Sequence, residues 1–137
     1  MKKYQFIHED KVRDYECDLQ GIVNNANYQH YLEHTRHEFL VSQNLSFAQL
    51  HDKGTDAVVA RVSIDYKQSL RPGDIYLSCL NVKKEGIKYV FHQDIYRKED
   101  EKLCIRAKIE TVTVINGKLS SCPEFDAILC EYVKIDG

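Results

Sequence analysis

Hydrophobic and polar positions repeat with two different periods along this chain. Between about Ala26 and Ser42 the apolar positions recur every three or four residues, which is typical of a helix with one buried face. At 100° per residue, four of them fall within about 40° of one line, with Tyr31 near its edge: Tyr28, Leu32, Thr35 and Phe39. We therefore predict a long helix that packs this stripe against a sheet.

From Ala57 the period changes from 3.6 to 2 residues, as a half-buried strand requires. In the first such strand, one face carries Val58, Ala60, Val62, Ile64 and Tyr66. Three more strands are predicted over residues 75–83, 88–97 and 103–115, separated by short polar links. Sequential strands with short links favour an antiparallel meander.

The remaining segments complete the predicted layout. Residues 4–17 are expected to form a first strand, and residues 46–53 a short helix that begins at a Ser cap. Turns are predicted at 71–74 and at Asn116-Gly117. After Pro123 the pattern fits either a helix that starts at the proline or a strand over 127–133, and both interpretations remain open.

One early strand, one long helix and several antiparallel strands indicate an α+β fold, in which the helix lies across a curved sheet. A single helix leaves much of such a sheet uncovered, so pairing with a second copy of the chain is expected.

Length and composition limit the classes of function. A chain of 137 residues is expected to form one domain, residues 1–137, and its 43% hydrophobic and 29% charged residues are typical of a soluble globular protein. The net charge of −2 argues against nucleic acid or an anionic membrane as the main partner. We find no signal-peptide core and no membrane span, so a cytoplasmic location is expected.

Metal and disulfide chemistry have little support in the sequence. The five cysteines are odd in number and contain no Cys-x-x-Cys pair, so they are interpreted as small, mostly buried side chains. His30, His34 and His37 share one helix face, a spacing that can chelate a metal. That face lies roughly 200° from the apolar stripe, so a solvated or intersubunit role is preferred, and no metal or cofactor is predicted.

The stretch Asp18-Leu-Gln-Gly-Ile-Val-Asn-Asn-Ala-Asn-Tyr28 carries the candidate chemistry. It places an acid on a turn directly before a helix, whose first N–H groups have no partner inside the helix. Those groups can hold negative charge that develops on a carbonyl oxygen, so the pattern favours acyl-group hydrolysis. The same residue types are also ordinary turn and cap residues, which is the competing interpretation.

The segment Glu16-Cys-Asp18-Leu-Gln-Gly21-Ile-Val23, followed by Asn27-Tyr28, resembles the signature of the 4-hydroxybenzoyl-CoA thioesterase family of hotdog-fold acyl-CoA thioesterases. The resemblance is dense over residues 12–40 and looser over Asp65-Tyr66 and Arg71-Pro72-Gly73-Asp74. Many close relatives have His or an aromatic residue where this chain has Asn24-Asn25. This difference affects which acyl group the protein is expected to prefer, because the backbone role is open to any side chain.

The resemblance implies a hotdog fold and an acyl-CoA substrate, bound by a homodimer or homotetramer. It also implies a catalytic Asp18, as nucleophile or general base, and a thioester carbonyl polarised by the backbone N–H of Asn25. The substrate-binding residues that it suggests are Gly21, Val23, Tyr28, Lys67 and Arg71, the last two as cations for the phosphates of coenzyme A.

Other acids and other functions were compared with this interpretation. Glu16 is a less favoured catalytic acid, and Glu33 has an ordinary surface ion-pair explanation with Arg36 or His37. Glu38 has no such partner at i+3 or i+4. The alternative functions are a non-catalytic acyl-CoA-binding protein and a hotdog hydratase or dehydratase, which usually pairs its acid with a catalytic His.

Overall fold

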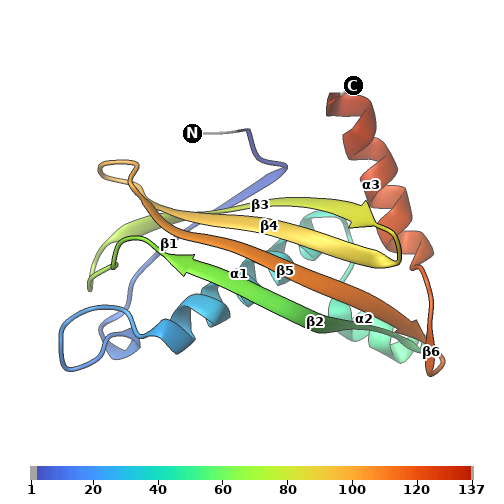
Figure 1. Ribbon diagram of the computed structural model, residues 1–137, viewed down its shortest axis with the longest axis horizontal. Helices are drawn as coiled ribbons and strands as arrows, with labels where there is room; N and C mark the ends of the chain where they lie inside the picture. Colours follow the sequence, from blue (N-terminus) through green and yellow to red (C-terminus); the bar gives the residue numbers. More distant parts are fainter. Residues whose placement is uncertain (1–2, 137) are drawn as a thin grey trace.

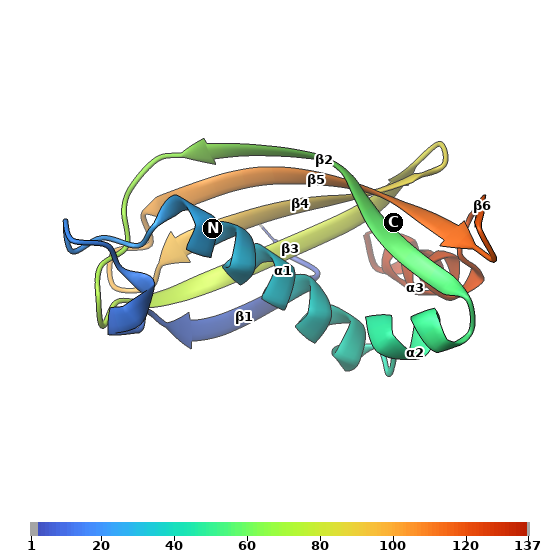
Figure 2. The ribbon, with the colours of Figure 1, turned by 90° about the horizontal axis from the view of Figure 1, so that it is seen from below.

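The structure, a computed structural model, describes residues 3–136, with side chains as far as residue 130. Its centre is an antiparallel sheet that curves around one long helix, α1 (Asn25–Ser42). Figure 2 shows the strands arching over α1, with the short helix α2 (Phe47–Asp52) beside it. The α+β prediction is therefore confirmed.

The sheet contains β1 (Phe6–Lys11), β3 (Ile75–Glu85), β4 (Lys88–Arg97), β5 (Leu103–Ile115) and β2 (Thr55–Tyr66), in that spatial order (Figure 1). The two-residue strand β6 (Lys118–Leu119) pairs with β5. The predicted meander is correct for β3, β4 and β5. It is wrong for β2, which pairs with the far side of β5 and forms an edge of the sheet.

Two local predictions about strands are corrected. The first strand ends at Lys11, and Asp14–Glu16 form a short 3-10 turn, because the chain at Val12 is paired with the 73–74 turn. In β2 a bulge between Val59 and Arg61 breaks the simple alternation. Before the bulge the odd-numbered residues face α1, as their pairing with the inward residues of β5 requires, whereas after it the even-numbered residues do.

The helices agree well with the sequence pattern. The predicted stripe of α1 is buried, and α2 begins after the expected Ser46 cap. Of the two interpretations for the C-terminal segment, the helix is correct: α3 (Pro123–Asp136) starts at the proline. Within residues 3–136 no helix has the length and apolar character needed to cross a membrane.

Two buried polar contacts fix α1 on the sheet. The hydroxyl of Thr35 donates to Ser78 Oγ on β3 (2.6 Å). Gln93 on β4 is fully buried; its amide donates to the Leu32 carbonyl (2.9 Å) and its side-chain oxygen accepts from Arg36 (2.9 Å). Buried polar groups that all find partners favour one register of packing, so the position of α1 along the sheet is well defined.

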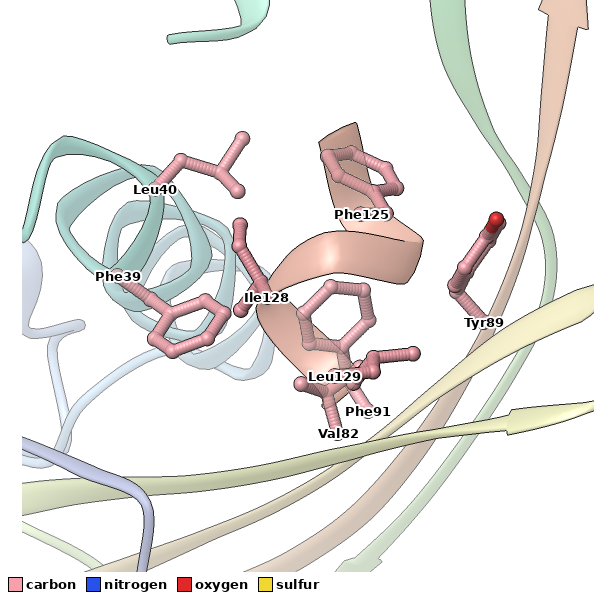
Figure 3. A pocket seen from close by; sticks show the side chains of 8 residues that line it. All are labelled: Phe39, Leu40, Val82, Tyr89, Phe91, Phe125, Ile128 and Leu129. Atoms are coloured by element: carbon pink, nitrogen blue, oxygen red, sulfur yellow. The ribbon is translucent and has the colours of Figure 1, made fainter. Parts of the chain in front are cut away.

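The C-terminal end of α1 is closed by α3. Phe39 and Leu40 of α1 meet an apolar cluster from the sheet and α3 (Figure 3), which consists of Val82, Tyr89, Phe91, Phe125, Ile128 and Leu129. The free space among them is about 10 Å³, which is about the room of one water-sized sphere. The interior of this cluster is therefore packed core and offers no room for an acyl group.

Candidate active site

Asp18 lies on a tight hairpin directly before α1. The Gly21 N–H donates to the Asp18 carbonyl and the Asp18 N–H donates to the Ile22 carbonyl, both at 3.0 Å. This is the pattern of a three-residue loop in which the last residue has a positive φ, and Gly21 has φ +74°. Cys17 and Val23 pair across the base of the loop, so the turn brings Asp18 back beside the entry to the helix.

The two neighbouring acids have different environments. Glu16 accepts from the Arg13 N–H (2.7 Å) and from the Tyr31 hydroxyl (2.8 Å), and it forms an ion pair with the Arg13 guanidinium (3.5 Å). Asp18 is exposed, and one of its oxygens accepts from the Gln20 N–H (2.8 Å). Among the described residues its second oxygen has no hydrogen-bond partner, so this is the acid with a free lone pair.

The helix start offers an open backbone donor. Asn24 is the cap residue, and its side chain accepts from the Ala26 N–H (2.9 Å). Its carbonyl accepts from the Asn27 N–H (2.9 Å). Asn25 is the first helical residue and is exposed, and in the described part of the chain its N–H donates to no other group. The donor that the sequence singled out is therefore free to meet a ligand.

The predicted substrate-binding residues meet at the loop between β2 and β3. The Val23 N–H donates to the Leu70 carbonyl (2.9 Å), and the Leu70 N–H donates to the Tyr28 hydroxyl (2.9 Å). Val23 and Tyr28 are buried, so they hold this loop against the helix start. Lys67 and Arg71 lie on the same loop with exposed side chains. Both cations are thus carried by the segment that touches the start of α1.

Aromatic side chains support this end of the helix. Tyr31 stacks on Tyr76 of β3 with ring centroids 4.6 Å apart, and Tyr28 meets Tyr66 of β2 at 5.9 Å. Burial is the main cause that raises the pKa of Tyr28, Tyr31 and Tyr76, so all three stay protonated near neutral pH. No sequence pattern links Tyr31 with Glu16, although Tyr31 lies at the edge of the predicted stripe.

Cys17 is a poor nucleophile in this setting. Partial burial, followed by the nearby carboxylates of Asp14 and Glu16, raises the pKa of its thiol. A thiol with a raised pKa is mostly uncharged near neutral pH, and the thiolate is the reactive form. Asp18 is therefore the better candidate for the reacting group in this turn.

A groove of about 470 Å³ lies beside the second half of α1, between α2 and the first half of β2. Its lining includes Arg36, Phe47, Val59, Phe91 and Phe125. Asn25 and Arg36 are eleven residues apart, which places them about three turns apart on the same helix face. The groove is thus a candidate for the acyl group of a ligand whose carbonyl lies at the helix start.

Arg36 and the two helix acids differ from the sequence expectation. Arg36 is buried, and burial lowers the pKa of its guanidinium, which donates to Gln93 instead of forming a surface pair with Glu33. Glu33 pairs with His37 (3.8 Å), as one of the two expected partners. Glu38 has a partner one turn earlier, His34 (3.7 Å), which a search for residues at i+3 and i+4 misses.

Comparison with known proteins identifies the family. Residues 12–129 match the thioesterase-like superfamily. A candidate esterase of Aquifex aeolicus (strain VF5) is 32% identical over 120 residues, which cover 87% of this chain and 92% of that protein. A chloroplastic acyl-acyl carrier protein thioesterase of Arabidopsis thaliana is 31% identical over 101 residues, 73% of this chain but 53% of that protein.

Among solved structures, a 1,4-dihydroxy-2-naphthoyl-CoA thioesterase from Synechocystis superposes with a TM-score of 0.87 at 21% identity, over 92% of this chain and 96% of that one. The fold is therefore the hotdog fold that the signature implied. The chain belongs to the thioesterase-like superfamily, which supports hydrolysis of an acyl thioester as its general activity. The narrower family suggested by the signature remains a prediction.

Proposed function

We propose that this protein is an acyl-CoA thioesterase of the 4-hydroxybenzoyl-CoA thioesterase type, with Asp18 as its catalytic acid. One observation carries the proposal: the free carboxylate oxygen of Asp18 lies on a hairpin that closes against a helix start with an unused N–H at Asn25. An acid next to a preorganised donor is what cleavage of a thioester carbonyl needs.

In the proposed reaction the Asn25 N–H donates a hydrogen bond to the thioester oxygen as negative charge develops there. Asp18 then acts in one of two ways. It attacks the carbonyl, expels the coenzyme A thiolate and leaves a mixed anhydride that water hydrolyses. Alternatively, it takes a proton from a water molecule that attacks the carbonyl directly. Both routes consume one water and release a carboxylic acid and coenzyme A.

The remaining predicted residues have supporting roles. Gly21 allows the tight turn that brings Asp18 to the helix, and Val23 and Tyr28 hold the neighbouring loop. That loop offers Lys67 and Arg71 to the phosphates of coenzyme A. We propose a cytoplasmic homodimer or homotetramer, in which the groove beside α1 holds the acyl group.

A hydratase or dehydratase is less well supported. Such an enzyme usually pairs its acid with a catalytic His, and the chain has six: His8, His30, His34, His37, His51 and His92. None lies within the 12–28 segment, and none is recorded in contact with Asp18 in the described structure.

The test is thioester turnover against aliphatic and aromatic acyl-CoAs, and against the same acyl groups on an acyl carrier protein. Product acids are measured by chromatography, because the five cysteines would disturb a thiol-based dye. We expect Asp18→Asn to lower turnover by about a hundredfold or more while acyl-CoA binding is kept. Asp14→Asn, an exposed acid in the preceding 3-10 turn, is the matched control and should stay near wild type.

Each outcome separates the candidate functions. Binding without turnover would favour the non-catalytic acyl-CoA-binding alternative. Hydration of an enoyl group with the thioester left intact would favour the hydratase. Near-normal turnover in Asp18→Asn would refute the assignment of Asp18 and direct attention to Glu16.

A further inference from the structure

A second cluster of chemically active side chains lies between β1 and α1, on the helix side away from the groove. Alternate residues of β1 turn toward the helix, so His8 and Asp10 share its inward face. His34 approaches them from α1, with its ring centroid 5.1 Å from that of His8. Two histidines and one carboxylate from separate elements thus meet in space.

The ligand atoms of these three residues all lie within 4.8 Å of one another. The closest recorded approach is between His8 Nε2 and Asp10 Oδ2, at 3.8 Å. Ligand atoms around a tetrahedral Zn²⁺ are roughly 3.3 Å apart, given bond lengths near 2.0–2.2 Å. The ligand atoms must therefore move an ångström or so closer together to bind the ion. The half-exposed His34 side chain can make this movement by rotation.

In the described part of the chain, one atom of the cluster lacks a hydrogen-bond partner. His8 Nε2 is shielded from solvent, and its contact with Asp10 Oδ2 at 3.8 Å is too long for a hydrogen bond. A shielded polar nitrogen without a partner is costly, and most such atoms in folded proteins are satisfied. A metal ion between His8, Asp10 and His34 would satisfy this nitrogen directly.

We propose that His8, Asp10 and His34 form a site for a divalent transition metal ion, with Zn²⁺ as the reference ion. Imidazole and carboxylate ligands in this ratio suit Zn²⁺ and its late first-row neighbours, whereas Ca²⁺ and Mg²⁺ prefer oxygen ligands. Three protein ligands leave a fourth position for water or for the Glu38 carboxylate, which is already 3.7 Å from His34 Nε2. The site is separate from the Asp18 turn and does not depend on the proposed hydrolysis.

Two competing interactions at Asp10 are compatible with metal binding. One carboxylate oxygen accepts from the Lys11 N–H (2.8 Å), which orients the group and leaves lone pairs available. The Arg13 guanidinium contacts both oxygens at 3.3 and 3.4 Å, but its side chain is 47% exposed, and exposed ion pairs of this kind are weak. Arg13 can therefore move aside for a metal ion.

The physical effect of the site would be to tie an edge strand to the long helix. Within residues 3–136, β1 pairs with no strand other than β3. A metal that bridges β1 and α1 binds the folded state and not the unfolded one, so it raises stability by mass action. At a free Zn²⁺ concentration a hundredfold above its dissociation constant, we expect the unfolding midpoint to rise by several degrees.

The experiment uses the full chain without an affinity tag, stripped of metal by a chelator. Zn²⁺ binding is measured by calorimetry, and Co²⁺ is used as a spectroscopic probe. We expect one ion per chain, with at least tenfold weaker binding in His8→Ala and in His34→Ala. His30→Ala and His37→Ala are matched controls, because both histidines are exposed on the same helix and lie outside the cluster.

Three results would overturn the proposal. The first is the absence of Zn²⁺ binding by the wild-type chain at millimolar metal. The second is unchanged binding in the double variant His8→Ala/His34→Ala when it is folded by circular dichroism. The third is a Co²⁺ spectrum with thiolate charge-transfer bands, which would place the ion on a cysteine such as the exposed Cys130.

Discussion

Glu16 and Asp18, two residues apart, differ in whether their carboxylate oxygens are free to contact a ligand. Glu16 is occupied by the Arg13 backbone and the Tyr31 hydroxyl, so it holds the helix start in place. Among the residues that the structure describes, the Asp18 carboxylate receives a single backbone hydrogen bond and keeps one oxygen free. One Glu16 partner, Arg13, is local, but the other, Tyr31, lies on α1, so residue type alone does not reveal the difference.

The role of the Asn25 backbone N–H can be tested by a substitution that keeps the helix. Proline suits the first helical position, and Asn24 has φ −67° and ψ 143°, a conformation that a following proline accepts. If the Asn25 N–H polarises the thioester, Asn25→Pro should lower turnover a hundredfold to a thousandfold, whereas Asn25→Ala should lower it less than about tenfold. The measurement is kcat and KM for both variants.

Circular dichroism must first show that both Asn25 variants keep their helix content. An equal loss of turnover in Asn25→Ala and Asn25→Pro would mean that the Asn25 side chain matters and that the backbone-donor mechanism is wrong.

At the scale of elements, the sequence predicted what local periodicity controls. The stripe of α1, the Ser46 cap of α2 and the strands β3, β4 and β5 all follow from spacing and turn residues. The place of β2 could not be predicted, because strand order depends on pairing between segments that are far apart in sequence. The prediction of Arg36 as a possible surface partner of Glu33 was also wrong, because the burial of Arg36 depends on Gln93 from another element.

The hairpin that carries Asp18 gives a prediction at this scale. Gly21 has φ +74°, and a Cβ added there would meet no atom within 4 Å, so Gly21→Ala costs only backbone strain of about 1 kcal/mol. Gly86, in the β3–β4 turn, has φ +62° and equally open surroundings, so Gly86→Ala is a matched control.

We expect the two glycine variants to lose similar stability in urea unfolding, while only Gly21→Ala loses turnover, because only that turn orients Asp18. A comparable loss of turnover in Gly86→Ala would show that general destabilisation, and not the Asp18 turn, controls activity.

At the scale of the whole molecule, β2 forms the longer of the two edges of the sheet. It is twelve residues long, and it exposes Val58, Val59, Val62 and Tyr66. A long apolar edge strand with unpaired backbone groups is a site of pairing with another chain. Pairing of two such edges would also bring a second copy close to the groove beside α1.

Assembly is therefore expected to be required for activity. Sedimentation at micromolar concentration should show no species at 16.0 kDa, the mass of one chain. Val62→Lys should weaken assembly and lower turnover together, whereas Leu119→Lys, an exposed apolar position on β6, should do neither. A stable and fully active monomer would contradict both the oligomer and a site shared between subunits.

The bulge between Val59 and Arg61 determines where β2 can change in length. Odd-numbered residues before the bulge and even-numbered residues after it face the same side of the sheet, because one extra residue, Ala60, lies between the two halves. Deleting Ala60 would remove the extra residue and leave both halves of β2 in register, because Val59 and Arg61 already pair with Thr111 and Glu110, which are adjacent in β5. Deleting a paired residue such as Ser63 would instead shift the register by one: with one half of β2 kept in place, the side chains beyond the deletion would exchange faces. A change of one residue in the length of β2 is therefore tolerable at the bulge and in the adjoining loops, but not at a paired position inside the strand.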